Sequence, residues 1–364
     1  MWGIHAIVSL RPVVTLAVGV SISLSSLTSC VEWTTDRKGN LTSIGLPGVP
    51  VWQEKTLAEQ KRLAAEGDLA SVPGATVDPA AARIVSTYSD AAWLTLVNQW
   101  RTAAGVDPVG ENVGLSLGSA QHARYLIKNG PDDAAAFARY VQTLGIQAHK
   151  EEQGNPYWTR EGSEAAQHGG IGWDQDSVAD VNGLLIAPFH RLPILAPWEK
   201  AAGYGDYGRW PRRAGVLAIR GSTPVGMIKP VLFPPDGATI ATGAMTDSEF
   251  PNPLAACPGY SYPVGLPITV QLGASVRVRL ESYSIEDETT SNQVETCGFD
   301  AHTYPEDYGH QVLLSYGAIV LVPRKPLAPD HGYRVSVKSH RDTYNWAFRV
   351  EKPKPTFRRA RAGE

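Results

Sequence analysis

The sequence predicts an α+β fold in two consecutive parts, a mixed region of helices and strands followed by an all-β region. In the stretch SDAAWLTLVNQWRTAAGV, which begins at Ser89, large apolar residues recur at helical spacing: Trp93, Leu96, Val97 and Trp100. From residue 276 to residue 281 apolar and charged side chains alternate, which is the pattern of a half-buried strand. A length of 364 residues allows about two domains of ordinary size, and 35 glycines and 27 prolines favour turns and β structure over a helical bundle.

Several elements are expected in each region. Thr56 and Glu59 match a capping box, which predicts a short helix at about 57–66. The first region should also contain helices at 116–130 and 132–145, an apolar stretch at 177–189 and a strand at 213–223. The second region holds short segments rich in β-branched and aromatic residues, which together predict an antiparallel β-sandwich: 268–272, 275–285, 311–323, 333–339 and 345–351.

The first thirty residues are expected to direct export. They contain no acidic residue, one arginine at Arg11 and an apolar run over 13–22 that is short for a bilayer span and leads into small residues. The final letters, LTSC, resemble the lipobox of bacterial lipoproteins, in which the cysteine, here Cys30, is lipidated and becomes the mature N-terminus. The alternatives are an ordinary signal peptide cleaved near Ser29 and an uncleaved anchor.

Lipidation at Cys30 would place the chain on the extracytoplasmic side of a bacterial membrane, at the outer membrane or the cell surface, because acyl chains bind bilayers through buried methylene groups. The other two cysteines, Cys257 and Cys297, are an even pair in an oxidising compartment, which favours one disulfide over two separate buried thiols. The formal net charge of -3 gives no reason to expect nucleic acid as a partner.

The order of segments from residue 89 to about 232 resembles the CAP domain, the cysteine-rich secretory or SCP-like superfamily, in its bacterial form. LVNQWRTAAGVDPV resembles the first helix of that family, SLGSAQHARYLIKNG the second, AHKEEQGNPYWTREGSEAAQ the histidine-bearing stretch, and VADVNGLLIAPFHRLPILAPWEKAAGYG the helix that ends in His-Arg. This resemblance implies a three-layer α-β-α sandwich. The C-terminal segments, which include SEFPNPL and GLPITVQL, resemble an immunoglobulin-like sandwich of bacterial surface proteins.

With these resemblances, the chain is expected to divide as follows: 1–29, lipoprotein signal peptide; 30–85, tether with one short helix; 86–232, CAP-like domain; 233–351, immunoglobulin-like β-sandwich; 352–364, basic disordered tail.

The CAP resemblance implies a cleft around two histidines, His149 and His190, in which some family members bind a divalent metal. The acidic partners of the family are less well matched. When GSEAA is aligned with the family's G-E-N-I-A segment, Ser163 occupies the acidic position and Glu164 falls one position later. His149, Glu164 and His190 could still supply a His₂Glu set for a metal such as zinc, provided that the fold brings them together. Otherwise each is a satisfied polar residue.

A second motif, GLSLG at 114–118, matches the G-x-S-x-G nucleophile elbow. That motif works only on a strained turn between a strand and a helix, with a base within hydrogen-bond reach. No strand of convincing length is predicted before Ser116, so the sequence favours a chance match.

Taken together, these patterns predict a surface lipoprotein that binds a lipid, a glycan or a protein at the cell envelope through a histidine-lined cleft. The depleted acidic set argues against strong general acid-base catalysis. Two alternatives stay open. The first is a metal-dependent, peptidase-like hydrolase that uses His149, His190 and Glu164 to activate water. The second is a structural module whose cleft binds nothing.

Overall fold

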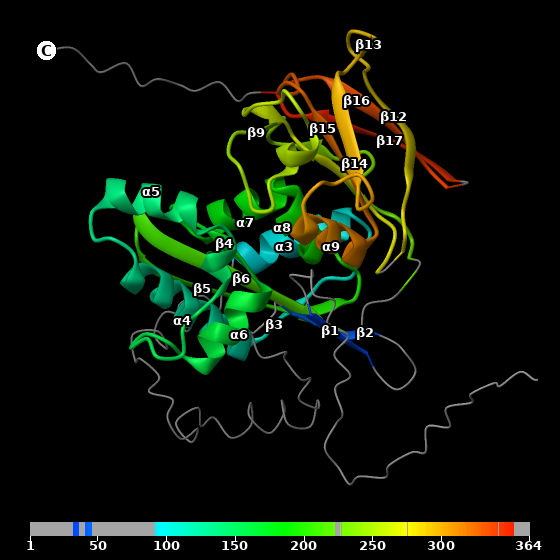
Figure 1. Cartoon of the computed structure of the whole chain (residues 1–364). Helices are drawn as coiled ribbons and strands as arrows, with labels where there is room; N and C mark the ends of the chain where they lie inside the picture. The colour runs from blue at the N-terminus through cyan, green and yellow to red at the C-terminus, as the bar shows by residue number, and fades with distance from the viewer. Residues whose placement is uncertain are drawn as a thin grey trace, which may run out of the picture.

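The computed structural model describes residues 32–35, 41–45, 92–222, 226, 228–274, 276–340 and 342–352 (Figure 1). The predicted signal peptide, Cys30, the expected helix at 57–66 and the tail after residue 352 lie outside the described residues. In the segment expected to be a tether, the structure contains two short antiparallel strands, which the sequence analysis did not predict: β1 (Glu32–Thr35) and β2 (Leu41–Gly45).

The mixed α+β character of the first part is confirmed. Its helices are α3 (Ala92–Ala103), α4 (Val113–Asn129), α5 (Ala134–Leu144), the 3-10 helix η2 (Gly145–His149), α6 (Arg160–His168), α7 (Ser177–Ile186) and α8 (Pro188–Ile194). Its strands are β3 (Gly110–Glu111), β4 (Gly169–Gly172), β5 (Glu199–Arg209) and β6 (Arg212–Gly221).

Local chemistry explains where these helices begin and end. Asn112, Asp133, Thr159 and Asp176 each cap a helix by accepting a hydrogen bond from a backbone N–H of the first turn. Helix α3 ends before Gly105, whose φ of +74° suits a residue without a Cβ. The predicted apolar stretch at 177–189 divides into α7 and α8, because Pro188 begins a new helix.

Four strands form the central sheet of the first part, in the order β3-β5-β6-β4. Helices α4 and α6 cover one face, and α3 and α7 lie on the other (Figure 1). Helix α4 approaches very closely, since a Cβ on Gly203 would lie 2.3 Å from the backbone nitrogen of Ser116. On the opposite face Trp93 of α3 contacts Tyr204 of β5, with a ring-centroid distance of 5.8 Å. The first part is therefore layered, with helices on both faces of a mostly antiparallel sheet.

The second part consists mainly of two facing sheets. One has the order β14-β15-β11-β7 and the other β13-β12-β16-β17-β8. The bounds are β7 (Val231–Phe233), β8 (Thr239–Ile240), β11 (Ile268–Gln271), β12 (Leu280–Asp287), β13 (Asn292–Gln293), β14 (Thr296–Asp300), β15 (Ala318–Pro323), β16 (Gly332–Ser339) and β17 (Asp342–Val350). A two-stranded sheet, β9 (Ala244–Met245) with β10 (Val264–Gly265), the 3-10 helix η3 (Pro253–Ala256) and helix α9 (Asp307–Tyr316) complete it.

Two predictions for this part were wrong in detail. The segment at 311–323 was expected to be a strand, but its first half belongs to α9, which ends at Gly317 with a left-handed φ of +52°. The strand expected from residue 275 begins only at Leu280, after a turn in which the N–H of Val276 is bonded to the carbonyl of Gly273. The two cysteines, Cys257 and Cys297, are joined in a disulfide with a Cα–Cα distance of 5.8 Å.

The two parts share a hydrophobic core. Ile194 and Leu195 at the end of α8 belong to the same buried cluster as Phe233 and Ile268 of the second part. Arg191 reinforces this junction, because its guanidinium is fully buried and donates hydrogen bonds to carbonyls on both sides of it. Within the described residues, no helix combines the length and the apolar character needed to cross a membrane.

Candidate functional site

The ring of His190 is held by a carboxylate from the second part of the chain. His190 lies in the first turn of α8, and its Nδ1 is 2.7 Å from Oε2 of Glu249. The same carboxylate accepts the backbone N–H groups of Phe189 and His190, at 3.0 and 3.1 Å. Glu249 therefore caps α8 and orients the imidazole at once. Only 4% of its side chain is exposed, whereas 18% of the His190 side chain is exposed.

Glu249 is the residue that sequence reasoning missed. It lies in the connection after β9, 59 residues beyond His190, within the stretch assigned to the sandwich region. No local pattern marks it, because the contact depends on how the second part sits against α8. The carboxylate that holds His190 therefore comes from Glu249 in the second part of the chain and not from a residue near 163.

His149 ends η2, and its Nδ1 lies 2.9 Å from the backbone carbonyl of Ala166 at the end of α6. Since a carbonyl only accepts, Nδ1 carries the hydrogen. Burial is the main cause that lowers the pKa of His149, to about 4, and the nearby ring of His190 lowers it further. The ring is therefore neutral at pH 7, with a lone pair on Nε2. We call His149, His190 and Glu249 the histidine site.

This environment gives the first prediction. The His149 ring should remain neutral until the pH falls to about 4, whereas an unperturbed histidine takes up its proton near 6.5. The pKa of His149 is lower in the folded chain than in the unfolded chain, so the unfolded chain binds the proton first as the pH falls. The contribution of His149 therefore lowers the free energy of unfolding progressively as the pH falls from 6.5 to about 4. Long-range ¹H–¹⁵N NMR of the ring checks the tautomer and the midpoint, and a midpoint at or above 6.5 would contradict the assignment.

The third member of the predicted metal set, Glu164, is placed elsewhere. Its carboxylate pairs with Arg160 one turn earlier on α6, with an Nε–Oε1 distance of 3.0 Å on a partly exposed helix surface. Among the residues that the structure describes, no group of three or more His, Cys, Asp or Glu side chains is arranged to hold a metal ion. The expected set of His149, Glu164 and His190 is therefore not assembled. Glu164 follows Arg160 by four residues on α6, so the two side chains lie on the same face of the helix and form an ion pair there.

Other polar groups near these elements have structural roles. His122 of α4 is fully buried, with Nδ1 2.9 Å from Glu151 and Nε2 2.8 Å from the Ala148 carbonyl, which ties α4 to the segment that follows η2. Asp180 of α7 is buried against Arg213, at 2.8 Å, and the hydroxyl of Tyr204, at 2.5 Å. Both carboxylates are thus engaged within the fold.

Ser116 does not occupy a nucleophile elbow. It lies in the first turn of α4, after the two-residue strand β3 and the cap at Asn112, and its side chain is fully buried. Its hydroxyl donates to Oε1 of Glu111 at 2.9 Å and accepts the backbone N–H of Tyr204 at 3.2 Å. The hydroxyl is used to join the helix to the sheet, which agrees with a chance match of the motif.

No protein-family model matches the chain, and the comparison with curated proteins likewise gives no match.

Proposed function

We propose that this chain is an exported bacterial lipoprotein, anchored through Cys30 on the extracytoplasmic side of the outer membrane or the cell surface, that binds an envelope component at the histidine site. In this proposal the first part is a CAP-like domain and the second an immunoglobulin-like sandwich. The layering of helices on both faces of the β3-β5-β6-β4 sheet and the two facing sheets of the second part support these assignments. The envelope component is a lipid, a glycan or a protein.

The main support for binding at the histidine site is that both imidazole rings are held in place by hydrogen bonds. Each Nδ1 is held by a defined acceptor, Ala166 O for His149 and Glu249 for His190. In the neutral His149 ring, Nε2 is left to accept a hydrogen bond from a ligand. Glu249 already receives three hydrogen bonds and Glu164 pairs with Arg160, so the arrangement suits recognition better than water activation by a metal. A hydroxyl-rich glycan is the first ligand class to test, because hydroxyls donate well to neutral imidazole.

The test is co-sedimentation of residues 31–364 with insoluble peptidoglycan and, in parallel, with phosphatidylglycerol vesicles. We expect the unmodified chain to bind one of these two materials. The affinity should fall by about tenfold or more in both His149→Ala and His190→Ala, since each variant removes a fixed hydrogen-bonding group. His302→Ala, at an exposed histidine of the second part, is the matched control and should bind as the unmodified chain does.

Zinc, calcium and manganese contents of the same proteins separate the alternatives. About one metal per chain, lost in both variants and accompanied by hydrolysis of a peptide or ester, would replace the binding proposal with the metal-dependent hydrolase. If binding is unchanged in both variants, or absent in all proteins, the histidine site is not the recognition site.

A further inference from the structure

The segment that follows β9 contacts both of the elements that carry the histidines. In Figure 1 this segment, drawn in yellow-green, runs from the second part toward the helices of the first part. Its Glu249 holds α8 and the His190 ring. The next residue, Phe250, lies against the start of η2. A Cβ built on Gly145 would be 3.7 Å from Cδ2 of Phe250 and 4.0 Å from its Cε2, which is ordinary van der Waals contact.

The position of η2 depends on its neighbours, because a 3-10 helix of five residues has few hydrogen bonds of its own. The carbonyl of Ala148 lies 2.8 Å from Nε2 of His122 on α4, and the His149 ring is bonded to the end of α6. Both contacts come from the first part and lie at the C-terminal end of η2. Phe250 adds a contact at the other end, at Gly145, and this contact comes from the second part.

Phe250 is itself held firmly by the second part. Its ring is stacked on Tyr308 of α9, with a centroid distance of 5.4 Å and an interplanar angle of 22°. Two residues later, the side chain of Asn252 caps η3 and accepts the hydroxyl of Tyr262 at 2.9 Å. The hydroxyl of Tyr304 donates to the carbonyl of Asn252 at 2.8 Å. The segment can therefore support η2 as a rigid part of the second part.

We propose that Phe250 is a positioning residue of the histidine site: its ring fixes η2 against the second part, and together with Glu249 it sets the separation between His149 and His190. This inference rests on the proposed function, because the ligand is the one that the two rings recognise there. Two rings held at one separation bind a ligand with less loss of conformational entropy than rings that must first be ordered. Truncation of Phe250 leaves a space into which η2 can shift, so the His149 ring should move while His190 stays on Glu249.

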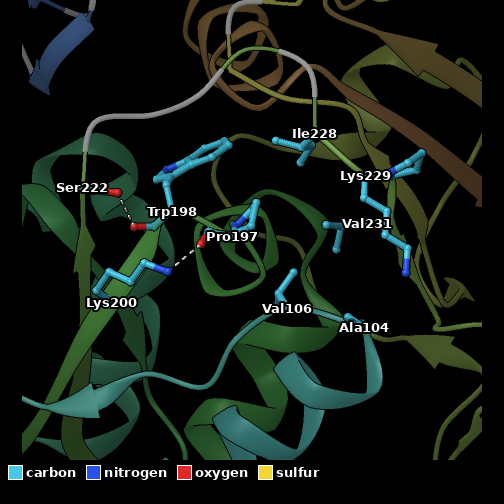
Figure 2. A pocket seen from close by; sticks show the side chains of 11 residues that line it. Ala104, Val106, Pro197, Trp198, Lys200, Ser222, Ile228, Lys229 and Val231 are labelled. Carbon is cyan, nitrogen blue, oxygen red and sulfur yellow. Dashed lines mark hydrogen bonds between the residues drawn. The ribbon is translucent and has the colours of Figure 1, made fainter.

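Another stretch of the junction between the two parts supplies the control. A cavity of about 400 Å³ lies there, with Val106, Trp198 and Ile228 in its wall (Figure 2). None of the residues that line this cavity belongs to η2, to α8 or to the segment 246–252. Ile228 is half-buried and packs against the apolar cluster that contains Ala196 and Trp198. Ile228→Ala therefore removes apolar packing from the junction and leaves the contacts of the histidine site in place.

The binding experiment is co-sedimentation of residues 31–364, which include every described residue, with insoluble peptidoglycan. We expect Phe250→Ala to weaken binding roughly three- to tenfold, and Phe250→Tyr, which keeps the ring, to bind as the unmodified chain does. Ile228→Ala should bind as the unmodified chain does, although its thermal unfolding midpoint falls. An equal loss of affinity in Ile228→Ala, or a lowered unfolding midpoint with unchanged affinity in Phe250→Ala, overturns the proposal.

NMR relaxation dispersion tests the positioning role without a ligand. In Phe250→Ala, the amides of residues 145–149 and the ring of His149 should show exchange broadening that is absent from the unmodified chain and from Ile228→Ala. The Nδ1 resonance of His190 should stay unchanged, because Glu249 still accepts its hydrogen bond. If none of the proteins binds peptidoglycan, the proposed function fails for that ligand, and these resonances still decide the role of Phe250. Sharp, unshifted resonances of η2 and His149 in Phe250→Ala overturn that role whatever the binding result.

Discussion

Replacing Arg191 by methionine is expected to lower the free energy of unfolding by about 3–5 kcal/mol, because it removes the partner of several buried acceptors. The guanidinium donates to the carbonyls of Leu185 and Pro267 at 2.6 and 2.8 Å, and to the hydroxyl of Thr269 at 3.3 Å. It also lies over the ring of Phe233, 3.9 Å from its centroid. Methionine has similar bulk but donates no hydrogen bond.

Keeping the Arg191 charge in the core also has a free-energy cost, which Arg191→Met removes. Burial lowers the pKa of Arg191 to about 9, which means that its charge is expensive to keep in the core. At pH 7 the guanidinium is nevertheless still protonated, and Glu249 supplies a nearby negative charge. Because removal of one member of a buried polar network leaves the others unsatisfied, the loss of partners should exceed the relief of desolvation.

The acceptors of Arg191 lie on both sides of the junction, so the variant should also loosen the coupling between the two parts. Urea unfolding followed by tryptophan fluorescence and by far-UV circular dichroism measures both effects. Coincident transitions in the unmodified chain should separate in Arg191→Met. Arg334→Met removes an exposed pair with Glu288 and should change stability by no more than about 0.5 kcal/mol. A loss below about 1 kcal/mol in Arg191→Met would show that the buried guanidinium merely fills space.

The fold was predictable where the sequence pattern is local. The apolar spacing of Trp93 and Val97 acts within one or two turns, so α3 follows from neighbouring residues, and the segments expected at 116–130 and 132–145 form most of α4 and α5. Helix α6 was not predicted, although Thr159 caps its first turn. Helix α9 was missed because QVLLSY is apolar without a clear period, and a short apolar run fits a strand or a buried helix equally well.

The candidate site depends on contacts that the sequence does not encode locally. His149 and His190 were proposed from the CAP resemblance, and the His190 ring contributes to the lowered pKa of His149. Glu249 could not be found in the same way, because it comes from the other part of the chain and no spacing rule connects it to His190. Glu164 illustrates the opposite error, since proximity in an aligned motif did not place its side chain at the site.

Glu249→Gln is the second variant with a large expected effect. The N–H of Phe189 is bonded to one oxygen of Glu249 and that of His190 to the other. In glutamine one of these oxygens becomes an NH₂ group, which only donates, so the side chain can accept one of the two N–H groups but not both. We expect the free energy of unfolding to fall by about 1–3 kcal/mol, because a helix cap and a charge-assisted hydrogen bond are lost together. Chemical denaturation measures this loss, and Glu295→Gln, at an exposed pair with Arg324, is the control.

The same variant tests whether Glu249 positions the His190 ring for recognition. If it does, the affinity for the envelope component should fall in Glu249→Gln nearly as far as in His190→Ala. The double variant Glu249→Gln/His190→Ala should then lose little more affinity than either single variant. The Nδ1 resonance of His190 should shift in Glu249→Gln, because the group that accepts its hydrogen bond changes. The Nδ1 resonance of His149 should stay unchanged, because that ring keeps its tautomer. Stability that falls while binding and the ring resonances stay as they were would limit Glu249 to capping α8. An effect on binding with a coupling of at least about 1 kcal/mol would establish that residues of both parts of the chain build one site.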